Sequence, residues 1–172
     1  VKPPKRLERN LNNIVAGNTA LSGATGGQLF VSGGVGERFA VRNSGATAVI
    51  EGAGDHCCEY MTGGQVVILG EVGANFGAGM TGGFSYVLDE KKSFFDKCNR
   101  ELINLDRVLS ETMDPHRQNL KLLIEEHYKI TKSLKAKEIL EDFERYLPNF
   151  WLVSPVALSV NDLLKATTAS AA

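Results

Sequence analysis

The stretch Thr62-Gly63-Gly64-Gln65-Val66-Val67-Ile68 decides the fold, because its pattern recurs at a nearly constant interval. A Thr or Ser followed by Gly begins the pattern again at residues 25, 44 and 81, so the steps between copies are 19, 18 and 19 residues. Each copy continues into a short apolar run and then ends at a Gly or an Asp. Short β-type segments that recur at a fixed period are typical of a solenoid, in which each coil stacks on the one before.

The glycines of the repeat are interpreted as corners of the coils. A corner often needs a positive φ angle or a close backbone approach, and glycine meets both demands at little cost. The predicted corner residues are Gly26, Gly27, Gly45, Gly63, Gly64, Gly82 and Gly83.

Equivalent residues of stacked coils are expected to lie above one another in the interior, since parallel pairing joins each strand to the same strand of the next coil. A second track of the repeat opens at Gly36, Gly54 and Gly73 and reaches Phe39, Cys57 and Phe76 three residues later. These last three residues are predicted to form an interior ladder. A second ladder is predicted from Val31, Ile50, Ile68 and Val87.

The composition changes near residue 90, because all 18 glycines precede it. We therefore expect an extended lead-in over 1–13, a mainly β, single-stranded parallel β-helix with ~18–19 residues per coil over 14–89, and a helical C-terminal extension over 90–172. Helices are predicted near 114–131 and 133–147, where apolar residues recur at helical spacing between Asp114-Pro115 and Pro148. Extended segments are expected within 102–109 and 149–155. The end near 168–172 is predicted to be disordered.

Bulk properties exclude several classes of function. A net charge of -1 argues against nucleic-acid binding. No apolar run approaches the roughly 20 residues that cross a bilayer, which predicts no membrane partner. The three cysteines fit neither a disulfide framework nor a zinc site, and indicate a reducing, intracellular setting.

Two local patterns suggest chemistry, and each has a structural interpretation that we prefer. Residues 77–82 read Gly-Ala-Gly-Met-Thr-Gly, a dinucleotide-type motif, but a strand rather than a helix is expected to follow. His56 precedes Cys57, yet neighbours on a strand point to opposite faces and seldom form a catalytic pair. We therefore predict no catalytic, cofactor-binding or metal-binding residue in this chain.

A polar group on the second track is a candidate contact region. Arg38 and Arg42 are expected to reach Glu59 of the next coil, either in a structural ion-pair ladder or as an anion-binding site. Arg38, Arg42 and Asn43 are the residues that we expect to contact another domain.

Three longer stretches, 36–46, 51–64 and 75–83, together resemble the C-terminal GXGXG domain of the large subunit of glutamate synthase. The resemblance is close over 14–89 and looser through Trp151. It implies a right-handed parallel β-helix. It also implies a non-catalytic scaffold that holds the glutaminase domain and the FMN-containing synthase domain together, in an enzyme that transfers the amide nitrogen of glutamine to 2-oxoglutarate.

The same resemblance implies that FMN and an iron–sulfur cluster belong to other parts of the parent enzyme, and that the partners are its other domains. It implies a cytoplasmic location, or a plastid for a photosynthetic eukaryote. The family's domain has further coils before the position of Val1, so self-association through an uncapped N-terminal edge is expected. At the other end, a cap is expected within 89–104.

Two alternatives remain open from the sequence. One is a hexapeptide-type acyltransferase, whose left-handed coils also take ~18 residues and in which His56 would act as the base. The other is a β-helix subunit related to formylmethanofuran dehydrogenase, which shares the glycine repeat.

Overall fold

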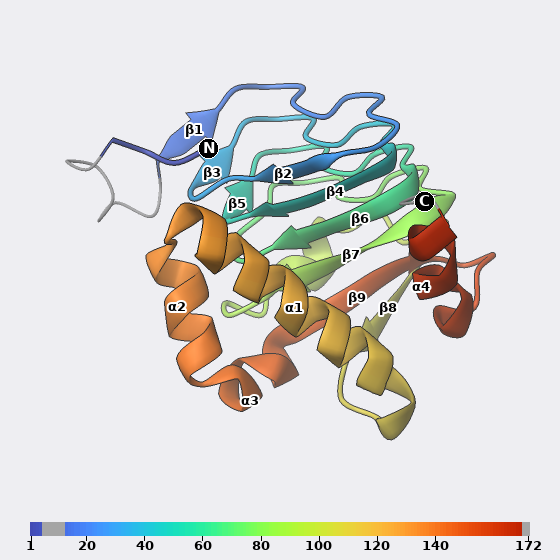
Figure 1. Ribbon diagram of the computed structural model, residues 1–172. Helices are drawn as coiled ribbons and strands as arrows, with labels where there is room; N and C mark the ends of the chain where they lie inside the picture. Colours follow the sequence, from blue (N-terminus) through green and yellow to red (C-terminus); the bar gives the residue numbers. More distant parts are fainter. Residues whose placement is uncertain (5–12, 170–172) are drawn as a thin grey trace.

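The computed structural model describes residues 1–4 and 13–169, and its element order places about four glycine-rich coils before a mainly helical half (Figure 1). Most of the predicted lead-in, residues 5–12, lies outside the described residues.

Two sides of the coils are parallel sheets. The short strands β1 (Ile14–Ala16), β3 (Gly34–Val35) and β5 (Gly52–Ala53) pair in that order. The longer strands are β2 (Gln28–Phe30), β4 (Ser44–Ile50), β6 (Thr62–Ile68) and β7 (Gly82–Leu88). They pair in parallel, each with the equivalent strand of the next coil. The third side of each coil is a run of turns without regular strands.

The larger sheet continues beyond the coils with antiparallel strands. β9 (Phe150–Pro155) pairs with β7, and β8 (Ile103–Arg107) pairs with the far side of β9. The strand order is therefore β2-β4-β6-β7-β9-β8. The prediction of a solenoid is confirmed in a coarser form, as a solenoid-like stack of about four coils that shares a mixed sheet with a few helices.

Helices cover the outer face of this sheet. α1 (Asp114–Thr131) crosses it obliquely, and α2 (Leu134–Glu141) and α3 (Phe143–Tyr146) turn back beside it (Figure 1). α4 (Val160–Ala169) packs against β6 and β7. Residues 168 and 169 are thus helical, and the rest of the predicted disordered end, 170–172, lies outside the described residues. Three short 3-10 helices complete the half: η2 (Phe94–Lys97), η3 (Glu111–Met113) and η4 (Leu147–Asn149).

Local sequence explains the ends of α1 and α2. Pro115 occupies the first turn of α1, where its missing N–H costs nothing. The helix ends at Lys132, whose left-handed backbone lets its N–H donate to the carbonyl of Tyr128. Ser133 then accepts a hydrogen bond from the backbone N–H of Ala136 and caps α2.

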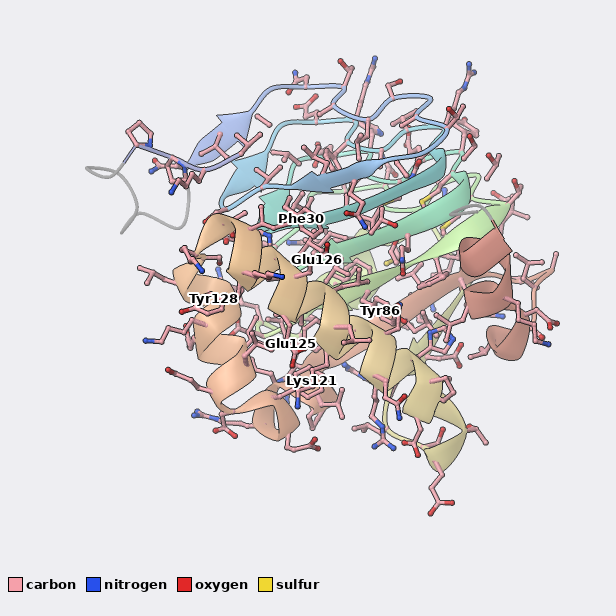
Figure 2. The ribbon with its side chains drawn as sticks, viewed as in Figure 1. Phe30, Tyr86, Lys121, Glu125, Glu126 and Tyr128 are labelled. Atoms are coloured by element: carbon pink, nitrogen blue, oxygen red, sulfur yellow. The ribbon has the colours of Figure 1, made fainter. Side chains whose placement is uncertain are left out.

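The strands separate two hydrophobic cores, one inside the coils and one between the sheet and the helices. Alternate residues of a strand point to opposite faces, so Val66 and Ile68 fill the coil interior while Val67 packs toward the helices. Phe30 and Tyr86 belong to the helix-side core, and Figure 2 shows them beside α1. Burial on both faces explains why the repeat reads as continuous apolar runs rather than as alternating residues.

The segment after β7 closes the last coil. Phe94 is buried and its ring meets the ring of Phe76 edge to face, with centroids 5.2 Å apart. Phe76 also forms a parallel bridge with Cys98, so η2 takes the place of a further coil on this side. The Asp89 carboxylate fixes the turn by accepting hydrogen bonds from the backbone N–H groups of Ser93 and Phe94.

Candidate functional site

The residues of the two predicted interior ladders lie in one buried cluster inside the coils. Phe39, Cys57 and Phe76 are each almost completely buried there. The N–H of Cys58 donates to the carbonyl of Phe39, and the N–H of Gly77 donates to that of Cys57, at 2.9 Å each. In the second set, Ile50 is paired with Ile68 and Ile68 with Val87, and Val31 is buried in the same cluster.

The third side of the coils has an unusual backbone, in which every second residue has a positive φ angle. In one coil Arg38, Ala40 and Arg42 have φ angles of 59°, 56° and 56°. The equivalent residues of the other coils are Thr19, Leu21 and Gly23; His56, Cys58 and Tyr60; and Asn75, Gly77 and Gly79. Most of the left-handed residues on this side carry a side chain, so the conformational freedom of glycine does not explain their backbone.

Hydrogen bonds between coils explain how this strained backbone is held. The N–H groups of Arg38 and Arg42 donate to the carbonyls of Asp55 and Glu59 in the next coil, at 2.8 and 2.9 Å. The N–H of Ala40, between them, donates to Ala20 in the preceding coil at 2.9 Å. The left-handed residues of this coil therefore donate in turn to the next coil, to the preceding coil and to the next coil again. A left-handed non-glycine residue costs about 1 kcal/mol or more, which these bonds offset.

Arg38 and Arg42 are exposed on this third side. The predicted ion pairs with Glu59 do not form; instead the Glu59 carboxylate lies 2.7 Å from Nδ1 of His56. The Glu59 carboxylate is thus paired within its own coil, and Arg42 is joined to Glu59 only through the backbone. Neither arginine side chain has an ion pair with any residue that the structure describes.

Asn43 lies in a different environment from these arginines. It is fully buried, its Oδ1 accepts from the N–H of Ala46 and its Nδ2 donates to the carbonyl of Ala46, at 2.9 Å each. The side chain holds the start of β4 from within and offers no surface to another domain. The interdomain contact expected for Asn43 is therefore not available to it.

The glycines predicted as corners lie at the starts of the long strands. Gly45, Gly63 and Gly82 are inside β4, β6 and β7, next to irregularities in the strand register. Gly27, Gly64 and Gly83 follow the first glycine of each pair and have φ angles of 88°, 78° and 70°. Gly26 directly precedes Gly27, before β2 begins.

The motif at residues 77–82 continues into β7 and no helix follows it. A Cβ atom at Gly79 would lie 2.5 Å from the ring of Tyr60, so close packing between coils accounts for this glycine. The dinucleotide interpretation therefore lacks the helix N-terminus that would bind a pyrophosphate.

Cys57 and His56 do not form a nucleophilic pair. Cys57 is buried, and burial followed by its contact with Cys58, 3.7 Å away, raises the pKa of its thiol well above the usual range. Burial also raises the pKa of Cys98 to about 12. Protonated thiols of this kind are poor nucleophiles and poor metal ligands. Among the residues that the structure describes, no three His, Cys, Asp or Glu side chains are arranged to hold a metal ion.

The described part of the chain has no helix that is both long and apolar enough to span a membrane.

A buried polar network that the sequence did not reveal joins the sheet to α1 and α4. Nε2 of His116 donates to the carbonyl of Val160 at 3.0 Å, so Nδ1 is free to accept from the hydroxyl of Tyr86 at 2.7 Å. Asn119 donates to both Tyr86 and Gln65. Burial lowers the pKa of His116 below its ordinary 6.5, although the bond to Val160 acts in the opposite direction.

This network predicts that the stability of the chain falls as the pH drops below about 6.5. The unfolded chain takes up a proton on His116 near pH 6.5, whereas the folded chain does so at a lower pH, so acid favours the unfolded state. The full contribution of His116 to stability is present above pH 6.5. Urea unfolding at pH 7.5 and 5.5 should show a smaller loss of stability in His116→Gln than in the wild type. The half-exposed His56→Gln is the control, and an equal loss in His116→Gln would contradict the assignment.

A second buried polar group fastens the C-terminal end of α1 to the coils. Oε1 of Glu51, in the link between β4 and β5, accepts hydrogen bonds from the Ser133 hydroxyl and from Nε2 of His127, which is 3.3 Å away. Only Glu51 could have been noticed in the sequence, because it is a charged residue directly after a buried apolar strand. The distant helix residues carried no signal of their own.

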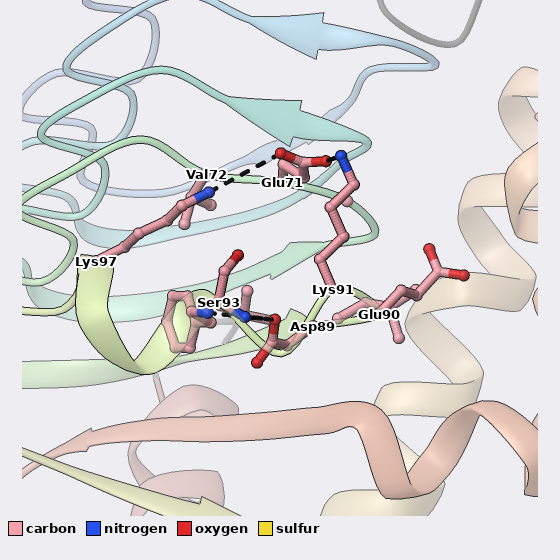
Figure 3. Close-up of a pocket in the computed structure, with 11 residues that line it drawn as sticks. Glu71, Val72, Asp89, Glu90, Lys91, Ser93 and Lys97 are labelled. Carbon is pink, nitrogen blue, oxygen red and sulfur yellow. Dashed lines mark hydrogen bonds and ion pairs between the residues drawn. The ribbon is translucent and has the colours of Figure 1, made fainter.

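Two concave regions lie between the short sheet and the segment after β7. The smaller is shown in Figure 3, where Glu71 forms ion pairs with Lys91 and Lys97 above the turn that Asp89 holds. The larger is a groove of about 710 Å³ that follows the short sheet from Ile14 to Lys135 at the start of α2. Its lining includes glycines at 34, 36, 52, 54 and 70 and the charged residues Glu37, Glu51, Glu71, Glu90, Lys91 and Lys135.

The stacked coils, with paired glycines at the start of most long strands, make this chain a solenoid-like protein of the glycine-repeat type. Comparison with known proteins agrees with this class. The family model described as "GXGXG motif" matches residues 1–156, and the chain belongs to this family.

Its relatives are ferredoxin-dependent glutamate synthases. The protein of Pyropia yezoensis is 52% identical over 155 residues, which are 90% of this chain and 10% of the relative. The chloroplastic protein of Spinacia oleracea is 57% identical over 82% of this chain and 8% of its own length. Ferredoxin-dependent glutamate synthase 2 of Synechocystis is 54% identical over 84% of this chain and 9% of its own length. The chain thus spans about a tenth of the length of these relatives.

Proposed function

We propose that this chain is a non-catalytic scaffold domain of a glutamate synthase, and that its coils are right-handed. In this role it holds the glutaminase domain and the FMN-containing synthase domain of a longer polypeptide in fixed relation. The observation that carries the proposal is the stack of coils, which is hydrogen bonded between neighbours on all three of its sides. A body bonded in this way resists bending, which a spacer between two active sites requires.

The parent reaction would transfer the amide nitrogen of glutamine to 2-oxoglutarate, with electrons from ferredoxin. The names of the relatives support the electron donor. FMN and the iron–sulfur cluster would belong to the parts of the polypeptide outside this chain. A location inside the cell, in the cytoplasm or in a plastid, agrees with the chloroplastic relatives.

The third side of the coils is the surface that we assign to contact with the other domains. Arg38 and Arg42 are exposed there, and Tyr60 of the next coil is 55% exposed on the same track. Arginine and tyrosine are the residue types most enriched at the energetic centres of interfaces.

Reversing both charges tests this assignment in the full-length polypeptide that carries the chain. The double variant Arg38→Glu, Arg42→Glu should loosen the contact and release ammonia that would otherwise reach 2-oxoglutarate. We expect the ratio of free ammonia to consumed 2-oxoglutarate to rise about fivefold, the effect of losing roughly 1 kcal/mol of attraction between domains. The ratio is measured in steady state with glutamine as the nitrogen source.

Arg145→Glu is the matched control, because Arg145 is an exposed arginine on α3, away from the coils. It should leave the ratio unchanged. An unchanged ratio in the double variant, with the polypeptide still folded, would rule out this surface as the coupling contact.

The N-terminal end of the stack is proposed to pair with another strand. β1 and β2 are the first strands of their sheets, and Ile14 of β1 is 69% exposed. Val1 bonds to Phe30 and Ser32 at the end of β2, whereas β1 has no further strand beside it among the described residues. A strand edge of this kind favours association. The isolated 172-residue chain should therefore sediment as a dimer at micromolar concentration. A stable, well-folded monomer in sedimentation velocity experiments would contradict this prediction.

A further inference from the structure

The groove along the short sheet has an excess of negative charge. Glu71 is paired with Lys91, and Glu90 is paired with Lys135 at 2.7 Å. Both lysines of the groove are therefore already neutralised. Glu37 has no ion pair with any described residue, and Glu51 has none apart from its contact with His127.

Glu51 gives a second reason, independent of the net charge of the groove, to expect a ligand there. Its side chain is only 4% exposed, and its two hydrogen bonds both use Oε1. Oε2 has no partner among the described residues. Within that part of the chain, the fully enclosed side-chain atoms without a partner are only Nδ1 of His127 and Oγ of Ser154. Oε2 is therefore not sealed in, and Glu51 lines the groove. A carboxyl oxygen held at such a position favours a cationic partner.

The floor of the groove suits an extended chain. The groove follows the short strands β3 and β5, and the glycines at 34, 36, 52, 54 and 70 line it without a side chain. A peptide backbone can approach such a floor closely, as when an extended segment binds along a sheet.

We propose that the groove binds an extended segment that carries lysine or arginine side chains and belongs to the remainder of the longer polypeptide. This inference rests on the proposed scaffold function. One basic side chain of the segment reaches Oε2 of Glu51, and another pairs with Glu37. The relatives, which are about ten times longer than this chain, show how much polypeptide is available to supply the segment.

Photo-crosslinking in the full-length polypeptide tests the proposal. p-Benzoylphenylalanine is placed at Ile14 or at Glu37, which line the groove and are exposed, and the crosslinked peptides are identified by mass spectrometry. The expected product joins either position to one segment outside residues 1–172 with at least two Lys or Arg residues. The same probe at Leu122, on the exposed surface of α1, should not capture that segment.

A charge variant separates electrostatic recognition from simple proximity. With the probe at Ile14, Glu37→Gln should lower the yield of this crosslink about threefold, as expected for the loss of one exposed ion pair. Glu101→Gln, an exposed carboxylate that does not line the groove, should leave the yield unchanged.

Three outcomes would overturn the proposal: no crosslink from either position, a crosslink to a segment without basic residues, or a crosslink only to residues 5–12 of this chain. A probe at Arg38 separates this failure from failure of the scaffold function. If the probe at Arg38 crosslinks to another domain while the probes in the groove give no crosslink, only the assignment of the groove is wrong.

Discussion

Replacing Gly63 with alanine is expected to lower the free energy of unfolding by about 3 kcal/mol. A Cβ atom at this position would lie 2.1 Å from the carbonyl oxygen of Ser44 and 2.9 Å from its carbonyl carbon. Ser44 is the register partner of Gly63 in the neighbouring coil, and β4 is held between β2 and β6. The obstacle is therefore backbone that is fixed from both sides and cannot move aside.

Gly26→Ala is the matched control in the first coil, where Gly26 holds the equivalent place in the repeat. No atom lies within 4 Å of a Cβ added there, and its φ angle is not in the left-handed region. Both substitutions reduce the entropy of the unfolded chain equally, so their difference measures the clash. Gly26→Ala should change stability by less than about 0.5 kcal/mol. Urea unfolding of the two variants is monitored by circular dichroism. Equal midpoints would refute the proposed role of Gly63.

The second large effect is expected at the C-terminal end of the stack, where Phe94→Ala should cost about 3–5 kcal/mol. The Phe94 ring is 2% exposed and packs edge to face on Phe76 inside the last coil. Truncation leaves a cavity there and opens the interior ladder to water. Hydrogen exchange should also accelerate at Phe76 and Asn99, whose N–H groups bond between the last coil and the cap.

Phe95→Ala is the control, because the neighbouring ring is 44% exposed and lies outside the core. Its described contact is with the guanidinium of Arg100, 3.9 Å above the ring centre. Loss of an exposed cation–π contact costs about 0.5–1 kcal/mol. If both variants lose similar stability in guanidinium unfolding, Phe94 does not act as a cap.

The period of the sequence was sufficient to predict where the coils and their long strands lie. Steps of 18 and 19 residues placed Ile50, Ile68 and Val87 in equivalent positions, and the structure pairs them directly. This succeeds because parallel stacking repeats the same environment in each coil, and equivalent residues then face equal demands.

The alternating backbone of the third side could not be predicted in the same way. Residues 38, 40 and 42 are Arg, Ala and Arg, none of which favours a positive φ angle. Their conformation depends on hydrogen bonds to coils about 18 residues away, which local propensity does not include. The position of β9 between β7 and β8 was hidden for a similar reason: an extended segment was expected at 149–155, but its partners lie far away in the sequence.

The contact of Arg38 and Arg42 with another domain stays a prediction. Arg38 and Arg42 are at the surface, as a charged pair on a solenoid is expected to be. Asn43 is not, because its amide bonds to Ala46 within the same turn, a local preference of asparagine that competes with exposure. The groove had no sequence signal, since its glycines and its carboxylates come from separate coils.

The alternating φ angles and donor directions restrict changes of chain length on the third side. In each coil the Thr or Ser that begins the next repeat comes six positions after the first left-handed residue, at 19, 38, 56 or 75. Inserting one residue there would exchange left-handed and right-handed positions. Inserting two would keep the φ angles in phase, but it would exchange the residues that donate to the next coil with those that donate to the preceding one. The single-residue differences between coils fall instead after the long strand, since the steps from the Thr or Ser of the repeat to the next left-handed residue are 13, 12 and 13. Natural variation in the length of such coils should accumulate at that corner and spare the third side.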